Sequence, residues 1–303
     1  MRPTVHGIHH VTGIVREAQP NADFYANTLG LRFVKRTVDL EDRFSYHLHY
    51  GDATGAAGTV LTFFPFCEEA DGRVGRLQIS AVGLAVPSGS LDYWRERLSA
   101  RGHDPGSVET RFDERVLPVR DPDGTHLELV TARGHADPWD GPVPTVHGIR
   151  GLSGVSVLSA RPFVTASLLE TFGLERGGQD GDRVRYQTPR GVVDMLDRET
   201  SFGREGAGTL HHVALGVDDE PAFQEWRETL AGRDDCRVSY VKDREFYASL
   251  YVRDAGGILF ELATEPVDMT VGDPAPGHRL YLPDQFESDR ETIESQLPPL
   301  STP

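Results

Sequence analysis

The amino-acid sequence predicts an α+β protein built from four copies of a βαβββ module. An apolar, strand-like run followed by an amphipathic helix recurs four times along the 303 residues, at 5–66, 77–131, 146–197 and 209–265. The helical segments stop close to glycines, and the strand pairs that close the modules turn at segments containing Asp or Gly. These observations support the same module in each of the four segments.

Each module opens with a strand and continues with a short helix. The opening strands are "IHHVTGIV", "LQISAVGLAV", "GLSGVSVL" and "LHHVALGV", and the helices are expected at residues 21–29, 90–100, 162–171 and 221–230. Gly30, Gly102 and Gly173 follow the first three helices, where glycine is favoured at the C-terminal cap. The closing hairpins include "VRDPDGTHLELV", which turns at Asp123-Gly124, and "SLYVRDAGGILFELAT".

Two segments interrupt the repeat. Residues 133–145 ("RGHADPWDGPVPT") are rich in proline, glycine and aspartate and are predicted to form a linker. The chain is therefore divided into an N-terminal domain at 1–132, this linker, and a C-terminal domain at 146–265. Residues 266–303 form a tail in which an amphipathic helix is expected at 286–297.

Composition and charge exclude several classes of partner and location. A net charge of -16 argues against nucleic acid, whose binding needs a basic surface. No apolar run approaches the roughly 18 residues of a membrane span, and the start of the sequence shows no signal-peptide hydrophobic region. Cys67 and Cys236 lack metal or redox spacing, which is typical of thiols in a reducing cytoplasm. We expect a cytoplasmic protein.

The strongest chemical signal is a histidine pair that occurs twice. His9-His10 lies in the first opening strand and His211-His212 in the fourth, whereas the two middle modules offer Ala, Gly or Ser there. Adjacent residues of a regular strand face opposite sides, so the two histidines of a pair cannot do the same work. We expect the second histidine of each pair to face the site.

A carboxylate on the closing strand of the fourth module completes this set. Glu261 follows Gly257 by four residues, and the matching positions in the other modules are Thr62, Glu128 and Met195. Only the first and fourth modules together supply two histidines and a carboxylate, namely His10, His212 and Glu261. Glu128 has no histidine in its own module and is expected to be an ordinary strand carboxylate. His47 and His49 share a strand face without a carboxylate in their module, so they are expected not to be ligands.

Two neutral imidazoles and one carboxylate leave metal positions open for substrate and dioxygen. This arrangement is typical of non-haem Fe(II) enzymes; Mn(II) fits the same ligands, and ligand type also allows Zn(II). His9 and His211 then face away from the metal or lie beside it, where their rings would steer substrate or move protons. Thr12 follows His10 by two residues and shares its face. For these three residues, local packing is the alternative role.

With these residues in view, the sequence resembles the vicinal oxygen chelate superfamily (glyoxalase, bleomycin resistance protein and extradiol dioxygenase). Within it, the chain is most similar to ring-cleaving hydroquinone dioxygenases. The motifs that carry this likeness are "GIHHVTGIV", "DFYANTLGLRFVKRTVD", "HHVALGV", "DREFYASLYVRDAGGILFE" and "LPDQFE". The resemblance implies that the four modules pair into two half-barrel domains, with the metal site where the first and fourth modules meet.

The resemblance also implies a reaction, namely Fe(II)-dependent insertion of dioxygen into an aromatic ring that bears para hydroxyls. The metal ligands of the group match the second His of "HHVT", the second His of "HHVA" and the Glu of "GGILFE". Residues implied to support the chemistry are His9, Thr12, His211, Arg244 and Tyr251. Glu245 departs from the group, in which glycine is expected at this place, and this bears on the preferred ring substituents.

Strand geometry gives a separate test of Tyr251. A three-residue hairpin loop at 254–256 would pair Arg253 with Gly257 and place Tyr251 opposite Leu259, on the same face as Glu261. An even-length loop would turn Tyr251 outward. The alternative for Tyr251 is a half-exposed position on the strand without a role in the site. The alternative for Arg244 is a position on the protein surface.

Two classes of function compete with hydroquinone cleavage. One is another reaction of the superfamily, either extradiol cleavage of a catechol or a glyoxalase-like isomerisation with Zn(II) or Ni(II). The other is a binding protein that sequesters an aromatic ligand without turnover. The expected partners are a small aromatic substrate and dioxygen, without nucleic acid or membrane, and the sequence leaves open whether the chain forms a homo-oligomer.

Overall fold

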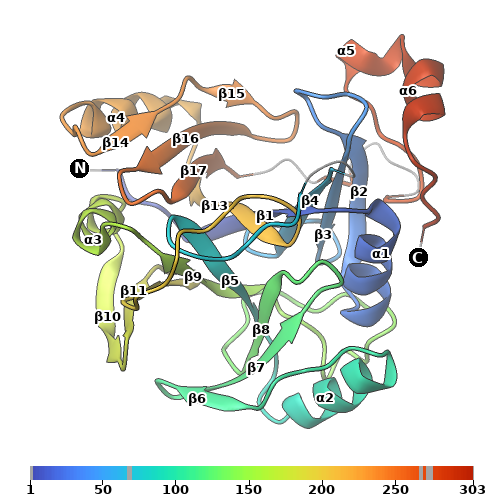
Figure 1. Cartoon of the computed structure of the whole chain (residues 1–303). Coiled ribbons are helices and arrows are strands. Elements are labelled where there is room, and N and C mark those ends of the chain that lie inside the picture. Colours follow the sequence, from blue (N-terminus) through green and yellow to red (C-terminus); the bar gives the residue numbers. More distant parts are fainter. Residues whose placement is uncertain (1–2, 67–69, 266–268, 271–275, 303) are drawn as a thin grey trace.

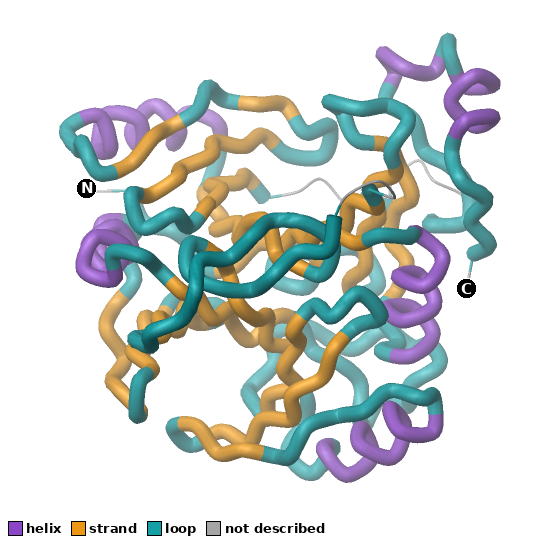
Figure 2. The backbone as a smooth tube through the Cα atoms, in the orientation of Figure 1, coloured by secondary structure: helices purple, strands orange, loops and turns teal. Residues whose placement is uncertain are grey.

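The computed structural model describes residues 3–66, 70–265, 269–270 and 276–302. Its strands form a 17-stranded sheet, and its helices lie around the outside of that sheet (Figures 1 and 2). Cys236 is a partly exposed free thiol, and Cys67 lies outside the described residues. In the described part of the chain, no helix combines the length and the apolar character needed to cross a membrane.

All four modules have the predicted order of elements. The first contains β1 (Ile8–Val15), α1 (Ala18–Ala22), the π-helix η1 (Asp23–Thr28), β2 (Arg32–Val38), β3 (Tyr46–Gly51) and β4 (Val60–Pro65). The second contains β5 (Gln78–Ala85), α2 (Leu91–Ala100), β6 (Glu109–Arg111), β7 (Glu114–Arg120) and β8 (His126–Val130). The third contains β9 (Leu152–Leu158), α3 (Pro162–Thr171), β10 (Glu175–Asp180), β11 (Arg183–Gln187) and β12 (Val192–Leu196).

The fourth module carries one additional short strand. It contains β13 (Thr209–Val217), α4 (Glu220–Ala231), β14 (Cys236–Val238), β15 (Lys242–Asp243), β16 (Ala248–Asp254) and β17 (Leu259–Thr264). The tail forms two short helices, α5 (Asp284–Glu287) and α6 (Arg290–Gln296), where the sequence predicted one. The interruption contains Asp289, which pairs with Arg43 at 2.5 Å, so this part of the tail is tied to the first module.

The first helix also differs from its predicted form. It begins at Ala18, before Pro20, because proline in the first helical turn removes no hydrogen bond that the helix would otherwise make. Its second half is π-helical, and the Leu29 amide donates to the Phe24 carbonyl at 2.9 Å. By contrast, α3 has the predicted bounds. Gly102 and Gly173, with φ of 80° and 90°, follow α2 and α3 in the left-handed conformation expected of caps.

Strand pairing groups the modules as first with fourth and second with third. β1 runs antiparallel to β13, and β5 runs antiparallel to β9. A single pairing, Leu210 with Ile79, connects β13 to β5 and so joins the two groups into one sheet. The sequence grouped consecutive modules instead; the domain boundaries at 132 and 145 stay a prediction.

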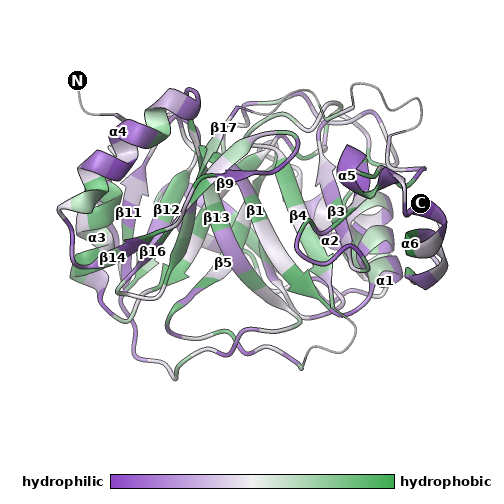
Figure 3. Cartoon of the chain, turned by 90° about the horizontal axis from the view of Figure 1, so that it is seen from above, coloured by the Kyte–Doolittle hydropathy of each residue, from purple (hydrophilic) through white to green (hydrophobic). Residues whose placement is uncertain are grey.

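Apolar side chains cover the strands and the inner faces of the helices. Figure 3 shows hydrophobic residues concentrated on the central strands and more hydrophilic ones on α5 and α6. Trp94 of α2 and Trp226 of α4 are fully buried, and each lies four residues before a buried leucine, Leu98 or Leu230. Burying a leucine side chain contributes about 1.5–3 kcal/mol, so these stripes anchor both helices to the sheet.

An aspartate closes each of two equivalent hairpin loops. The Asp121 carboxylate accepts from the Thr125 amide at 2.8 Å, and the Asp254 carboxylate accepts from the Ile258 amide at 2.7 Å. The second loop therefore spans Asp254 to Ile258 and pairs Arg253 with Leu259. The predicted pairing of Arg253 with Gly257 was wrong by two residues, but an odd-length loop preserves the face that each side chain occupies.

Candidate metal centre

Four neighbouring strands bring the predicted ligands together. β1 lies between β4 and β13, and β13 pairs in parallel with β17. Ala214 of β13 is opposite both His10 and Glu261, while His212 is opposite Thr12. The two strands that carry histidines and the strand that carries the carboxylate are therefore adjacent, and the first and fourth modules meet at this point.

The three side chains converge on a small volume. Nε2 of His212 lies 2.8 Å from Oε2 of Glu261, and Nε2 of His10 lies 3.5 Å from the same oxygen. The two Nε2 atoms are 3.4 Å apart. Among the described residues, these three form the only group of at least three His, Cys, Asp or Glu side chains whose candidate ligand atoms all lie within 4.8 Å of one another.

The surroundings of Glu261 fit a bound cation. Its side chain is 0% exposed, its Oε2 faces Nε2 of His212 and Nε2 of His10, and its Oε1 has no hydrogen-bond partner among the described residues. Burial acts to raise the pKa of Glu261, but the adjacent imidazoles of His10 and His212 hold that pKa well below its ordinary value. A buried carboxylate that stays ionised and faces two imidazole nitrogens needs a positive charge, which a divalent metal supplies.

The first histidine of each pair lies at an irregularity in the sheet. The register between β1 and β13 shifts between Ile8 and His10 and again between Thr12 and Gly13, so His9 and His211 are the extra residues of their strands. A bulge of this kind redirects a side chain. Nδ1 of His9 lies 2.8 Å from Nδ1 of His10, and the His211–His212 pair shows the same 2.8 Å separation.

These contacts determine which nitrogen of His10 and of His212 is available to bind a metal. A metal at Nε2 of His10 or His212 leaves the proton on Nδ1, which can then donate to its neighbour. Burial, together with the nearby His10, lowers the pKa of His9 to about 3. Burial and His212 lower the pKa of His211 to about 4. Both neighbours are therefore neutral near pH 7 and can accept that hydrogen bond.

Thr12 contacts one of the predicted ligands directly. Its Oγ1 lies 2.9 Å from Nε2 of His212 and 2.8 Å from Oγ1 of Thr62 on the adjacent β4. Thr12 and Thr62 are both buried and directly opposite each other in the sheet. The hydroxyl of Thr12 is therefore in contact with Nε2 of His212, the same nitrogen through which a metal would bind.

Arg244, Tyr247 and Tyr251 lie near the candidate ligands, on β16 and the segment that precedes it. Tyr251 is paired with Glu261 rather than with Leu259, so it faces the site as predicted, through a different partner. The Arg244 guanidinium donates to the Tyr251 hydroxyl at 3.0 Å. Burial and then the Glu261 charge raise the pKa of Tyr251 above its ordinary value, so this phenol stays protonated at neutral pH. Tyr247 packs at 5.3 Å, between ring centroids, from both His9 and His10.

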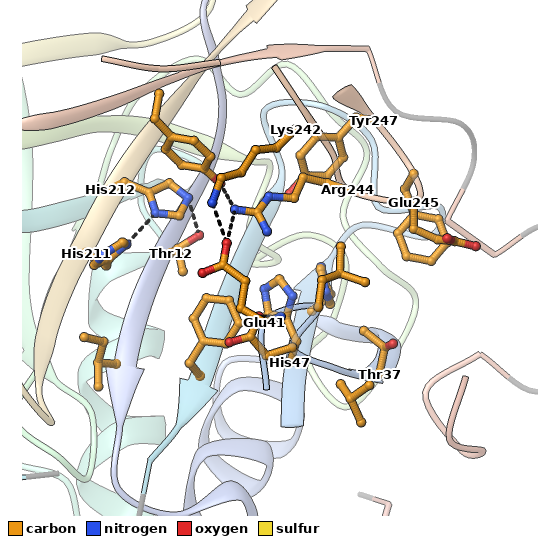
Figure 4. Close-up of a pocket in the computed structure, with 18 of the residues that line it drawn as sticks. Thr12, Thr37, Glu41, His47, His211, His212, Lys242, Arg244, Glu245 and Tyr247 are labelled. Carbon is orange, nitrogen blue, oxygen red and sulfur yellow. Dashed lines mark hydrogen bonds and ion pairs between the residues drawn. The ribbon is translucent and has the colours of Figure 1, made fainter. Parts of the chain in front are cut away.

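A cavity of about 370 Å³ opens beside these residues (Figure 4). His211 and His212 lie on one side of it, and His47 and Thr37 lie on the other. Its mostly apolar wall includes Ile14, Phe64, Phe66 and Leu259. Glu41, from the loop after β2, pairs with Lys242 at 2.5 Å and with Arg244 at 3.6 Å, and so joins the first module to the fourth across the cavity.

The second and third modules lack such a centre. Comparison of the four modules by sequence identified the missing histidines but not the position equivalent to Glu261. Aligning the strand irregularities places Ala81 and Gly154 where the other modules have His10 and His212. Asp194, not the predicted Met195, is equivalent to Glu261, because Ser156 pairs with Asp194 as Ala214 pairs with Glu261.

Arginines neutralise the carboxylates of these two modules. Arg183 lies 3.1 Å and Arg185 lies 2.9 Å from the Asp194 carboxylate. Glu128 pairs with Arg111 at 2.5 Å, in agreement with a structural carboxylate. These ion pairs take the place that histidine ligands and a metal would otherwise have.

Sequence reasoning missed several residues that line the cavity. Tyr247 lies one residue before β16 and four before Tyr251, so extending the period of two beyond the strand could have identified it. His47 and His49 lie outside the group of candidate ligands, and both line the cavity. Glu41 and Lys242 lie in a loop and at a short strand, where no periodic signal exists.

Comparison with known proteins agrees with this geometry. A model of the Glyoxalase/Bleomycin resistance protein/Dioxygenase superfamily matches residues 7–129. MhqO of Bacillus subtilis (strain 168), named as a ring-cleaving dioxygenase, is 39% identical over 301 residues, which cover 97% of this chain and 96% of the relative. The chain belongs to this superfamily. The predicted family and the α+β glyoxalase-like fold are thereby confirmed.

Other superfamily members extend the comparison. The chlorohydroquinone/hydroquinone 1,2-dioxygenase of Sphingobium indicum is 33% identical over 271 residues, covering 85% of this chain and 84% of that protein. A crystal structure of a Bacillus subtilis protein named as a dioxygenase has a TM-score of 0.94 at 38% identity and covers 99% of both chains. Maize glyoxalase I, at 12% identity, has a TM-score of 0.62 over 85% of this chain and 92% of its own, which supports the fold alone.

Proposed function

We propose that this superfamily member is an Fe(II)-dependent dioxygenase that cleaves the ring of hydroquinones. The observation that carries the proposal is the convergence of His10, His212 and Glu261 beside an apolar cavity large enough for a substituted ring. The Sphingobium indicum relative, named for hydroquinone cleavage, supports the same substrate class. We also propose that the protein acts in the cytoplasm on a small aromatic substrate and dioxygen.

Iron bound by these ligands would supply Lewis acidity and one-electron chemistry toward dioxygen, and Mn(II) is the alternative ion. The protein's own residues bind and orient the substrate. Phe64, Phe66 and Leu259 give the ring an apolar surface that excludes water. The Arg244 guanidinium lies where it can stabilise a phenolate oxygen by charge-assisted hydrogen bonds.

Proton transfer requires a donor and an acceptor near the substrate oxygens. Tyr251 retains its proton because burial raises the pKa of its phenol, and the adjacent Arg244 orients that group. Neutral His211 also lines the cavity, and while its Nδ1 accepts from His212 its Nε2–H can donate to a substrate oxygen. His9 lies behind His10 and acts on the ligand rather than on the substrate.

Oxygen consumption by protein reconstituted with Fe(II) tests the proposal. We expect uptake with hydroquinone and chlorohydroquinone, appearance of a ring-opened product, and loss of both in Glu261→Gln. Uptake with catechol alone would assign the chain to extradiol cleavage instead. Turnover of a non-aromatic substrate with Zn(II) or Ni(II), without oxygen uptake, would favour a glyoxalase-like isomerase. Binding of an aromatic ligand without any turnover would favour a sequestering protein.

A further inference from the structure

Two histidines of β3 line the cavity without a role in holding the metal. His49 is 2% exposed, and His47 stacks on Phe64 with ring centroids 4.1 Å apart and planes inclined by 19°. The two imidazoles lie 4.0 Å from each other, so each fixes the orientation of its neighbour. Phenylalanine would stack equally well at both places, so packing alone does not account for imidazoles here.

Three of the four nitrogens of these rings have no hydrogen-bond partner among the described residues. Nε2 of His47 and both nitrogens of His49 are buried without a hydrogen bond to any described residue. An unsatisfied buried polar atom costs about 1–3 kcal/mol, so it calls for a partner that enters from the cavity. Burial, with the nearby charges of His10 and Lys35, lowers the pKa of His49 to about 3. A neutral imidazole offers one donor and one acceptor, as a phenolic hydroxyl does.

Sheet register places His49 across the floor of the cavity from the metal ligands. His49 is opposite Thr62, Thr62 is opposite Thr12, and Thr12 is opposite His212, so one row of side chains crosses four strands. Two strand spacings of about 4.8 Å put β3 roughly 10 Å from β1. A ring with oxygens at opposite ends spans such a gap when one oxygen is on the metal. An ortho-diol keeps both oxygens at the metal side.

We propose that His47 and His49 bind the second hydroxyl of a para-diol and so select hydroquinones over catechols. This inference rests on the proposed function, because it requires the first oxygen to be bound at the site of His10, His212 and Glu261. Arg244 and Tyr251 lie on the opposite wall, beside the metal ligands, and are left to the first oxygen.

Equilibrium binding tests the proposal without turnover. Protein loaded anaerobically with Fe(II) is titrated with hydroquinone, phenol and catechol, and each dissociation constant is measured by calorimetry. The variants are His47→Phe, which keeps the stacking on Phe64, and His49→Leu; His49→Gln is expected to restore part of the binding. A matched control is His103→Phe, because His103 packs edge-on against Phe24 and does not line the cavity.

In His47→Phe and His49→Leu we expect hydroquinone affinity to fall about fivefold to tenfold, which is the effect of one hydrogen bond. Phenol and catechol affinities should stay within about twofold of the original protein, and the control should bind all three unchanged. Equal losses for hydroquinone and phenol, or no loss at all, would overturn the assignment while leaving ring cleavage intact. Failure of the unmutated protein to bind hydroquinone would overturn the proposed function together with it.

If His49→Leu does not fold, His47→Phe still decides the question, because His47 is only partly buried. Ring cleavage gives a second readout of selectivity. The preference for hydroquinone over catechol in kcat/KM should fall by the same factor as the ratio of their affinities. An unchanged preference would contradict selection by these histidines.

Discussion

Replacing Thr12 by valine removes a hydroxyl that competes with the metal for one ligand atom. Oγ1 of Thr12 lies 2.9 Å from Nε2 of His212 and 2.8 Å from Oγ1 of Thr62. A metal bound through the lone pair of Nε2 takes this nitrogen away from Thr12. The hydrogen bond to His212 therefore stabilises the metal-free state alone, and its loss should favour the loaded state.

The size of the effect follows from the value of one hydrogen bond. A net contribution of about 0.5–1.5 kcal/mol corresponds to an increase in metal affinity of about twofold to twelvefold in Thr12→Val. The metal-free variant should lose about 1–3 kcal/mol in its free energy of unfolding, because both hydrogen bonds disappear. Anaerobic competition with a fluorescent chelator measures the affinity, and urea unfolding of metal-free protein measures the stability.

Thr62→Val is the matched control, since it removes the bond between the threonines and leaves His212 with its partner. It should destabilise the metal-free protein by about 1 kcal/mol and leave metal affinity within about twofold. Weaker metal binding in Thr12→Val would refute the reasoning, because Thr12 would then support the loaded site.

Three further predictions concern other parts of the site. His10→Ala should abolish metal binding, whereas His9→Ala should keep the metal with about 10- to 100-fold lower affinity and mainly lower the reaction rate. Metal analysis and oxygen uptake measure the two effects. The reverse order would show that the ligand was assigned to the wrong histidine. Acid should destabilise the metal-free protein between pH 6.5 and about 3, because burial lowers the folded-state pKa of His9 and His49 from 6.5 to about 3 and the unfolded chain then binds more protons. Each adds up to about 1.4 kcal/mol per pH unit, and urea unfolding should show a shallower pH dependence in His49→Phe. Glu245 has a φ of 70°, which glycine adopts without strain and alanine does not. Both Glu245→Gly and Glu245→Ala lose the hydrogen bond from Tyr281, so the glycine variant should have the higher free energy of unfolding by about 1 kcal/mol. Equal stabilities of the two variants would argue against backbone strain.

Comparison of the internal copies predicted the modules and the converging ligands. Strand alternation and helix periodicity repeat with fixed periods, so equivalent positions could be compared without knowledge of the fold. His10 and His212 stood out because the middle modules have small residues there. The face of Tyr251 was also predicted correctly, because parity depends only on whether the loop length is odd or even.

Features that depend on two strands at once were beyond this reasoning. The irregularities at His9 and His211 exist only relative to the partner strand, so the sequence could not show that both imidazoles of a pair meet through Nδ1. The same holds for Asp194, whose equivalence to Glu261 follows from its pairing with Ser156. Pairing of the second module with the third is likewise a matter of long-range packing, whereas the two histidine pairs and Glu261 already indicated that the first and fourth modules meet.

Pairing between the two ends of the chain has a consequence for biosynthesis. His10 and His212 are 202 positions apart, so at 5–20 residues per second β13 leaves the ribosome about 10–40 s after β1. During that interval β1 has one edge without its native neighbour, and an exposed strand edge invites association with other chains. The metal proposed for His10, His212 and Glu261 cannot be bound until Glu261 has been made and β17 has joined the sheet. Acquisition of the ion thus reports that synthesis of the two terminal modules is complete.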